Sequence, residues 1–341
     1  MRKAIGLWLL ACSALVWIIL VSGGVTRLTH SGLSIVEWKP VVGAIPPLNK
    51  TQWEQEFEKY RDTPEYRYVN RGMSLQDFES IYLMEYAHRL LGRIAGIAFV
   101  APLLYFGLKR RIERSLLPKL TLIALLWASQ GALGWYMVSS GLVNEPHVSH
   151  YRLTAHLLTA CLLYAAMLST SLDLLRPAPP AAAGPRRSGL AALSALLVAL
   201  SFVTITSGGL VAGLHAGFQY NTFPRMDGHW VPPYLLSQQP LARNFFENKT
   251  TVQFDHRVLA VLLALTVAAL WIGGLRAGLP KRFTTALHVL AGVMAAQATL
   301  GIVTLLYAVP VALGAAHQGT ALLLLGAALL VRHEATLGPN R

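Results

Sequence analysis

Eight long apolar runs are the feature of this sequence that most constrains its fold. Each is long enough to cross a bilayer as a helix, which takes about 20 residues. Only 13% of the 341 residues are charged, against about 25% in a soluble domain, and the mean hydropathy is +0.47. The sequence therefore predicts an all-α polytopic membrane protein. Its predicted spans are a first run from the amino terminus to Val21, then 81–108, 117–139, 150–174, 189–212, 254–275, 283–307 and 310–331.

The positive charge of the chain follows the ends of these runs. The chain carries 29 Lys and Arg against 16 Asp and Glu, a net charge of +13. Such an excess can attract nucleic acid, but here it gathers in short loops, as the positive-inside rule predicts for cytoplasmic loops. We therefore expect a lipid bilayer and no nucleic acid as partner, with both termini cytoplasmic. The residues that set this orientation are Arg2, Lys3, Lys109, Arg110, Arg111, Arg176, Arg186, Arg187, Arg276, Lys281, Arg282 and Arg332.

Paired motifs divide the chain into two similar halves. Each motif of the first half returns in the same order in the second, which predicts two parallel four-helix bundles. The halves are residues 1–176 and 188–341, joined by a cytoplasmic linker, 177–187, that is rich in Pro and Ala. The matched motifs are Ser22-Gly23-Gly24 with Ser207-Gly208-Gly209, His88-Arg89 with His256-Arg257, Gln130-Gly131-Ala132-Leu133-Gly134 with Gln297-Ala298-Thr299-Leu300-Gly301, and Thr154-Ala155-His156 with Ala315-Ala316-His317.

Four histidines occupy matched positions near the outer ends of the even-numbered spans: His88, His156, His256 and His317. A four-helix bundle with one inward histidine on each of two helices can hold a haem iron by two axial imidazoles. The alternative for any single one is a histidine that hydrogen-bonds a neighbouring helix. Four at similar depth favour ligation. We expect two haem sites, one formed by His88 and His156 and one by His256 and His317.

Glu85 breaks the symmetry between the two halves. It precedes His88 by three residues, whereas Gln253 stands at the same place before His256. An ionisable group inside a span is costly and usually marks a function. The Glu85-x-x-His88 spacing also occurs in di-iron bundles, but those need a second Glu-x-x-His in the same bundle. Beside a haem, such a carboxylate either moves protons or stabilises positive charge, and the sequence leaves both roles open.

Two arginines follow these histidines directly. Arg89 follows His88, and Arg257 follows His256. Successive residues of a helix point about 100° apart, so the arginines do not share the direction of the histidines. We expect them either to pair with haem propionates, as cofactor-binding residues, or to anchor the helices at the membrane interface.

A set of short motifs in the outer loops and at the outer ends of the spans is specific. It comprises Ser31-Gly32-Leu33-Ser34, Trp38-Lys39-Pro40, Ile45-Pro46-Pro47-Leu48-Asn49, Pro64-Glu65-Tyr66, Glu85-Tyr86-Ala87-His88-Arg89, Val148-Ser149-His150-Tyr151-Arg152, Asn221-Thr222-Phe223-Pro224 and Phe254-Asp255-His256-Arg257. With these residues the chain resembles the haem A synthase family over essentially its whole length, in the mitochondrial and alphaproteobacterial branch. Another branch carries a cysteine pair in an outer loop. Here Cys12 and Cys161 lie in apolar runs, so a thiol-based step is not implied.

The resemblance implies an oxidoreductase that turns haem O into haem A by successive hydroxylations of the C8 methyl group. It implies a haem b cofactor held by His256 and His317, a substrate site near His88 and His156, and a catalytic role for Glu85. It places the protein in a bacterial inner membrane. The implied partners are a haem O synthase, an electron donor that is ferredoxin-like or a quinol, and cytochrome c oxidase assembly, and a homo-oligomer is compatible with the family.

A di-haem b protein that carries electrons from quinol is the alternative function, because two histidine pairs would serve it equally well. The asymmetry between Glu85 and Gln253 favours the enzyme, since a pure carrier needs no carboxylate at one site only. A solute transporter can also have parallel repeats, but this sequence shows no evident ion-binding pairs at mid-membrane.

Overall fold

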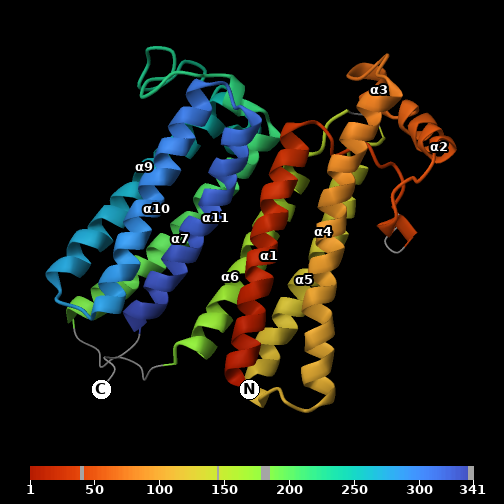
Figure 1. Ribbon diagram of the computed structural model, residues 1–341. Helices are drawn as coiled ribbons and strands as arrows, with labels where there is room; N and C mark the ends of the chain where they lie inside the picture. The colour runs from red at the N-terminus through yellow and green to blue at the C-terminus, as the bar shows by residue number, and fades with distance from the viewer. Residues whose placement is uncertain (39–41, 144–145, 178–184, 337–341) are drawn as a thin grey trace. The chain divides into compact units, whose positions relative to one another are not determined.

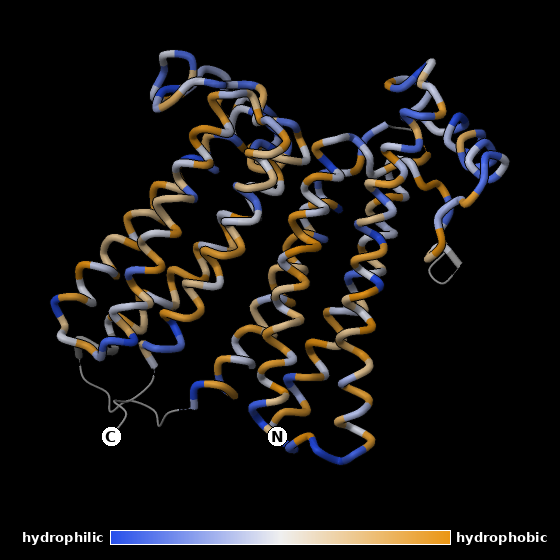
Figure 2. The backbone as a smooth tube through the Cα atoms, viewed as in Figure 1, coloured by the Kyte–Doolittle hydropathy of each residue, from blue (hydrophilic) through white to orange (hydrophobic). Residues whose placement is uncertain are grey.

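The computed structural model describes residues 1–38, 42–143, 146–177 and 185–336. Within these ranges the chain is mainly helical and contains no β-strand. Eight helices are long and apolar enough to cross a membrane. Figure 2 shows hydrophobic residues along these helices and hydrophilic residues mainly near their ends. The predicted class, an all-α polytopic membrane protein, is confirmed.

The observed helices agree closely with the predicted spans (Figure 1). The spanning helices are α1 (Arg2–Leu28), α4 (Leu75–Leu108), α5 (Leu117–Ser139), α6 (His150–Leu175), α7 (Pro185–Gly213), α9 (Lys249–Arg276), α10 (Lys281–Leu306) and α11 (Val311–Thr336). The shorter elements are α2 (Lys50–Arg61), α3 (Pro64–Tyr68), α8 (Asn244–Glu247) and the 3₁₀ turns η1 (Val42–Ala44), η2 (Arg114–Leu116), η3 (Ala216–Phe218) and η4 (Leu241–Arg243).

Helix α4 begins earlier than its apolar run. Its amino-terminal cap is Ser74, whose hydroxyl accepts a hydrogen bond from the Asp77 N–H at 3.1 Å. A serine in this position satisfies a backbone donor that the first turn leaves unpaired. Polar residues therefore extend the helix outward from the apolar run. As a result Glu85 lies well inside a helix, rather than at the start of one.

The segment between α1 and α4, which we call the outer segment after its predicted side of the membrane, contains two short helices, α2 and α3, that were not predicted from the sequence. Asn49 caps α2, because its side-chain oxygen accepts from the Gln52 N–H at 3.0 Å. Phe57 of α2 stacks on Phe78 of α4 with ring centroids 4.9 Å apart. Both rings are buried, so this contact holds the outer segment on α4. Lys39 and Pro40 of the family motif lie outside the described residues.

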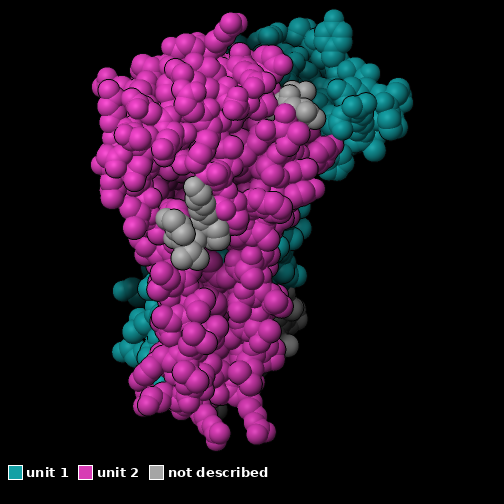
Figure 3. All heavy atoms as spheres, turned by 90° about the vertical axis from the view of Figure 1, so that its right-hand side faces the viewer, with its two compact units in different colours: residues 1–13, 161–341 teal, residues 14–160 magenta. Residues whose placement is uncertain are grey.

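The helices group into two compact units, coloured separately in Figure 3. The first unit along the chain, labelled unit 2 in Figure 3, is residues 14–160, with most of α1, all of α4 and α5, and the first part of α6. The second unit, labelled unit 1 there, is residues 1–13 with 161–341, and it contains α7, α9, α10 and α11. The two predicted halves stay a prediction, and most of the predicted linker between them, 178–184, lies outside the described residues.

Four helices of the second unit form a closed bundle. Helix α7 packs against α9 and α11, and α10 packs against the same two helices. The core between them is apolar and includes Leu197, Leu270, Leu287 and Ala328, one from each helix. In this arrangement α9 and α11 lie diagonally across the bundle. These are the two helices that carry the histidines of the predicted second haem site.

A buried carboxylate with two arginine partners joins three helix ends in the same unit. The side chain of Glu334 is 1% exposed and lies 3.0 Å from Arg176 Nη1 and 2.9 Å from Arg282 Nε, and the two arginine side chains are 49% and 28% exposed. A buried charge left without a partner is strongly destabilising. Arg176 and Arg282, which the positive-inside rule uses to orient the chain, thus also hold the ends of α6, α10 and α11 together.

Candidate functional site

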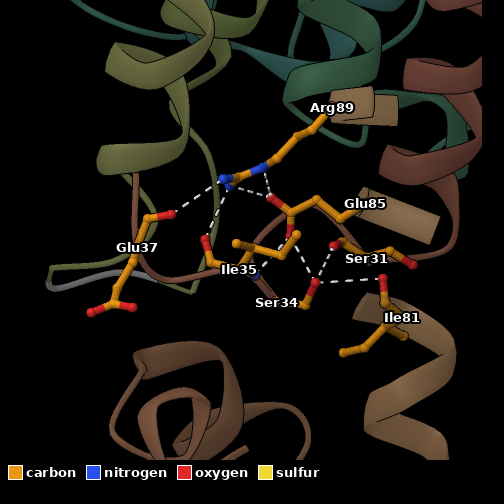
Figure 4. Close-up of polar contacts among 7 residues, drawn as sticks. All are labelled: Ser31, Ser34, Ile35, Glu37, Ile81, Glu85 and Arg89. Carbon is orange, nitrogen blue, oxygen red and sulfur yellow. Dashed lines mark hydrogen bonds and ion pairs between the residues drawn. The ribbon is translucent and has the colours of Figure 1, made fainter. Parts of the chain in front are cut away.

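Glu85 of α4 is buried, and both oxygens of its carboxylate accept hydrogen bonds (Figure 4). Oε2 accepts from the Ser34 hydroxyl at 2.7 Å and from the Ile35 N–H at 2.9 Å. Oε1 accepts from Arg89 Nε at 2.9 Å, as part of an ion pair between side chains one helical turn apart. The carboxylate therefore joins α4 to the segment that follows α1.

Arg89 strengthens the same junction. Its Nη2 donates to the Ile35 carbonyl at 3.0 Å, and its Nη1 donates to the Glu37 carbonyl at 3.5 Å (Figure 4). Glu85 and Arg89 are four residues apart on one face of α4, so they act together on the segment 34–37. The structure thus gives Arg89 protein partners, and its predicted pairing with a haem propionate stays a prediction.

The second unit repeats this arrangement without the carboxylate. Arg257 of α9 donates from Nη2 to the Tyr220 carbonyl at 3.0 Å and from Nη1 to the Thr222 carbonyl at 2.9 Å. Gln253, four residues before Arg257, donates from Nε2 to the Tyr220 carbonyl at 3.1 Å. Both arginines therefore hold the backbone of a loop that follows a spanning helix, but only Arg89 shares this task with a buried carboxylate.

The four predicted histidines come together as two pairs, one in each unit. His88 of α4 and His156 of α6 lie close enough for a charge on one to act on the other. His256 of α9 and His317 of α11 have ring centroids 6.5 Å apart and ring planes at 83°. The structure thus brings together the residues that the sequence analysis paired.

These pairs fit the chemistry of axial haem ligands. A metal ion bound by two imidazoles lies about 2 Å from one nitrogen of each ring. Adding the distance from each nitrogen to its own ring centre gives a centroid separation close to the 6.5 Å between His256 and His317. The Nδ1 atoms of all four rings are buried without an aligned hydrogen-bond partner. A buried polar atom without a partner destabilises a protein by about 1–3 kcal/mol. An imidazole that binds a metal uses one nitrogen for the metal and the other for a protein group.

The structure does not favour the di-iron alternative. The carboxylate of Glu85, which such a site would need as a ligand, accepts hydrogen bonds from Arg89, Ser34 and Ile35. Within the described ranges, no three His, Cys, Asp or Glu side chains lie close enough together to hold a metal ion. The residues of the site therefore fit a haem better than an ion bound by protein side chains alone.

His30 and His215 share a backbone conformation that the sequence did not reveal. Their φ angles are 52° and 55°, both in the left-handed region. They lie just after α1 and α7, where helices usually end on a glycine in this conformation. Both histidines therefore have a structural explanation as helix-ending residues.

Two groups near Glu85 escaped the sequence analysis. Ser34 was noted only as part of a family motif, and the structure makes it a direct partner of Glu85. The second group is a chain of polar side chains in the outer segment. Asn70 Nδ2 donates to the Tyr60 hydroxyl at 2.7 Å, and that hydroxyl donates to Glu65 Oε2 at 3.0 Å. Glu65 was noted only as part of the motif Pro64-Glu65-Tyr66, and the folding of α2 and α3 is what brings it together with Tyr60 and Asn70.

Glu65 makes the stability of this outer segment depend on pH. The pKa of Glu65 is raised to about 7, mainly by burial; the hydrogen bond from Tyr60 opposes this rise and the charge of Glu85 adds to it. The folded protein therefore binds this proton more tightly than the unfolded chain. The resulting stabilisation is complete below about pH 4.5 and is lost as the pH rises through about 7. At about 1.4 kcal/mol for each pKa unit, the loss is on the order of 3 kcal/mol.

We expect limited proteolysis of the segment between α1 and α4 to be faster at about pH 8 than at about pH 5. A protease whose intrinsic activity has been calibrated at both values makes the comparison. The variant Glu65→Gln is uncharged at both values, so its cleavage rate should not change with pH. A variant that keeps the wild-type pH dependence would show that another group is responsible.

The chain is similar to known proteins over nearly its whole length. Residues 6–329 match the family described as COX15-CtaA, cytochrome oxidase assembly protein. A heme A synthase of Nitrosospira multiformis is 54% identical, over 98% of this chain and 94% of its own length. One of Parvibaculum lavamentivorans is 46% identical, over 98% and 94%. The heme A synthase COX15 of Arabidopsis thaliana is 43% identical, over 97% and 74%. The chain therefore belongs to the COX15-CtaA family of cytochrome oxidase assembly proteins.

Proposed function

We propose that the protein is a haem A synthase, an oxidoreductase that converts the C8 methyl group of haem O to the formyl group of haem A. The product goes to cytochrome c oxidase. Relatives that bear this name share between 43% and 54% of their residues with the chain, which supports the activity. The observation within the molecule that carries the proposal is a buried carboxylate beside one histidine pair and an amide beside the other.

His256 and His317 would hold haem b as a resident cofactor, and His88 and His156 would bind the substrate haem O. The centroid separation of 6.5 Å and the diagonal placement of α9 and α11 support the first assignment. The matching burial of the Nδ1 atoms supports the second. When bound, the haems supply the redox-active iron that the oxidation requires. The histidines bind and orient them, and the apolar helices around them exclude water.

The contacts of Glu85 favour a positioning role in this reaction. Arg89 already balances its charge, and its other oxygen is held by Ser34 and Ile35. Glu85 also lies one helical turn before His88 on α4, on the same face. It therefore holds the segment 34–37 next to the substrate pair, and it fixes where protein atoms meet the edge of the substrate. Oε2 would be free to accept a proton only after release of the Ser34 hydroxyl or the Ile35 N–H.

The proposed setting follows the charge of the loops. The short loops rich in Lys and Arg face the cytoplasm, so both termini are cytoplasmic and the outer segment carrying α2 and α3 lies outside a bacterial inner membrane. A haem O synthase would supply the substrate. A ferredoxin-like protein or a quinol would supply electrons, and self-association into a homo-oligomer is compatible with this arrangement.

Extraction of pigments from the purified protein tests this function against a di-haem b electron carrier. A synthase made in cells that produce haem O should carry haem B together with haem O or haem A. A carrier should yield haem B alone. Adding haem O and a reductant to the wild-type protein should then produce haem A. Haem B as the sole pigment, with no conversion of added haem O, would overturn the proposal.

A further inference from the structure

Each of the four proposed ligand histidines packs its ring against a glycine of the preceding spanning helix. The pairs are Gly23 of α1 with His88, Gly134 of α5 with His156, Gly208 of α7 with His256, and Gly301 of α10 with His317. In every pair, the three atoms nearest to an added Cβ belong to the imidazole. Because glycine has no Cβ, the ring can lie directly on the helix backbone.

These four glycines differ from glycines that serve ordinary packing. A Cβ on Gly6 would meet leucine side chains, and one on Gly274 would meet Leu287 and Phe283. Small residues of that kind allow close contact between helices in membranes. The four glycines instead make room for a histidine ring, and they do so at all four proposed ligands.

The four contacts are not equally tight. A Cβ on Gly23 or on Gly301 would lie 2.8 Å from Cε1 of the facing histidine, and one on Gly208 would lie 3.1 Å from it. At Gly134 the distance is 3.4 Å, close to ordinary contact between carbon atoms at about 3.5 Å. We call the first three contacts the tight seats and the contact at Gly134 the loose seat.

A backbone carbonyl distinguishes the tight seats further. In each, the carbonyl four residues before the glycine interacts with the histidine: Ile19 with His88, Thr204 with His256, and Gln297 with His317. The Nδ1 atoms of these rings nevertheless have no hydrogen-bond partner of good geometry. Such a neighbour is the usual means of orienting a ligating histidine.

The loose seat has a different contact at the corresponding place. Gln130, four residues before Gly134, donates from its side-chain Nε2 to the backbone carbonyl of His156 at 3.4 Å. The matched residue in the second unit, Gln297, instead places its Nε2 3.5 Å from the ring Nε2 of His317. The side chain of Gln297 thus reaches the ring of its histidine, whereas that of Gln130 reaches the backbone of His156.

We propose that Gly23, Gly208 and Gly301 are positioning residues, each of which fixes the histidine packed against it for haem ligation. His156, which occupies the loose seat, is then the ligand that is displaced at the substrate haem. This inference rests on the proposed function. A resident cofactor needs two firmly held ligands, and His256 and His317 both occupy tight seats. A substrate haem must enter and leave, and its pair combines one tight seat with one loose seat.

Glycine-to-alanine variants test the seats through haem content and the visible spectrum of the purified protein. We expect Gly301→Ala and Gly208→Ala to lower haem b affinity by about tenfold or more, as loss of support to a ligand typically does. Gly134→Ala should match wild type. The controls are Gly292→Ala in α10 and Gly131→Ala in α5, where an added Cβ meets nothing within 4 Å. Each makes the same change in the same helix, with the same gain in helix propensity.

Circular dichroism and gel filtration show whether each variant keeps its helices and stays monodisperse. Normal haem b content and an unchanged spectrum in Gly301→Ala and Gly208→Ala would overturn the positioning role. So would an equal loss of haem b in Gly292→Ala, because the effect would then not depend on contact with a histidine.

Retention of haem O by variants of His88 and His156 tests which of these two ligands is displaced. His156→Ala keeps the firmly seated His88, so its loss of affinity for added haem O should be smaller than that of His88→Ala by about threefold or more. His88→Ala keeps only the loosely seated His156 and should lose haem O affinity by about tenfold or more. Equal retention by the two variants, or the reverse order, would overturn the assignment of His156.

The tests separate this inference from the proposed function. If wild-type protein binds haem as described but never converts haem O, the proposed function is wrong and the positioning role of the glycines still stands. If conversion is normal and the glycine variants match their controls, only the seats fail.

Discussion

Glu85→Gln is expected to abolish the conversion of haem O to haem A while haem b stays in place. The amide has a single acceptor oxygen, and it cannot form the ion pair with Arg89 or serve all the donors that now face the carboxylate. The segment 34–37 should then detach from α4 next to the substrate pair. A misplacement of about 1 Å near a reacting group can cost about 100-fold in rate. Haem A formed from added haem O measures the loss, and the visible spectrum measures haem b.

Two further variants separate the charge of Glu85 from its anchoring role. Ser34→Ala keeps the carboxylate and removes one donor to Oε2, so an anchoring role predicts a partial loss of activity, about tenfold or less. Glu79→Gln makes the same chemical change as Glu85→Gln earlier in α4, at a partly exposed side chain, and should behave like wild type. If Glu85→Gln converts haem O at the wild-type rate, the carboxylate has no part in the reaction.

His256→Ala is expected to lose the resident haem b, with haem content about tenfold or more below wild type. The variant removes one of two imidazoles that face each other across the bundle at 6.5 Å. The surrounding helices meet in an apolar core, and alanine offers no nitrogen to an iron there. Haem content is measured by extraction, and the spectrum reports whether two imidazoles ligate any haem that remains.

His288→Ala is the matched control for this experiment. His288 lies on α10 in the same bundle, but its side chain is exposed and its Nδ1 accepts a hydrogen bond from Trp271 Nε1 at 3.1 Å. It should keep the full content of haem b. A normal haem b spectrum in His256→Ala would overturn the pairing of His256 with His317. A loss in His288→Ala as well would point to general damage to the bundle.

The spanning helices were predictable because their signal is local. A bilayer leaves the helix as the only way for a single segment to satisfy its backbone, so a long apolar run predicts a helix without knowledge of its neighbours. The start of α4 was predicted too late, since hydropathy does not register a polar extension capped by Ser74. Helices α2 and α3 were missed for a related reason. They are short and polar, and contacts such as Phe57 on Phe78 stabilise them.

The candidate site was predictable in its residues and not in its contacts. The matched positions of His88, His156, His256 and His317 in the apolar runs indicated two pairs, because residues at similar distances along runs that start on the same side are expected at similar depth. The glycines were visible only as markers of the repeat. Their packing against histidine rings depends on how two helices lie together, and no spacing within one helix reveals it.

The sequence by itself determined that this chain is a helical membrane protein with two histidine pairs and one unmatched carboxylate. These features depend on the hydrophobicity of the residues and on their order in the sequence, and both are known without the folded structure. Only the tertiary structure decided what Glu85 does with its charge and how closely each histidine packs. Two partners of Glu85, Ser34 and Ile35, come from a loop distant in the sequence, and each histidine packs against a glycine on another helix. The contacts of Glu85 with the loop and of each histidine with its glycine are contacts between separate segments of the chain, and they are set by how those segments pack.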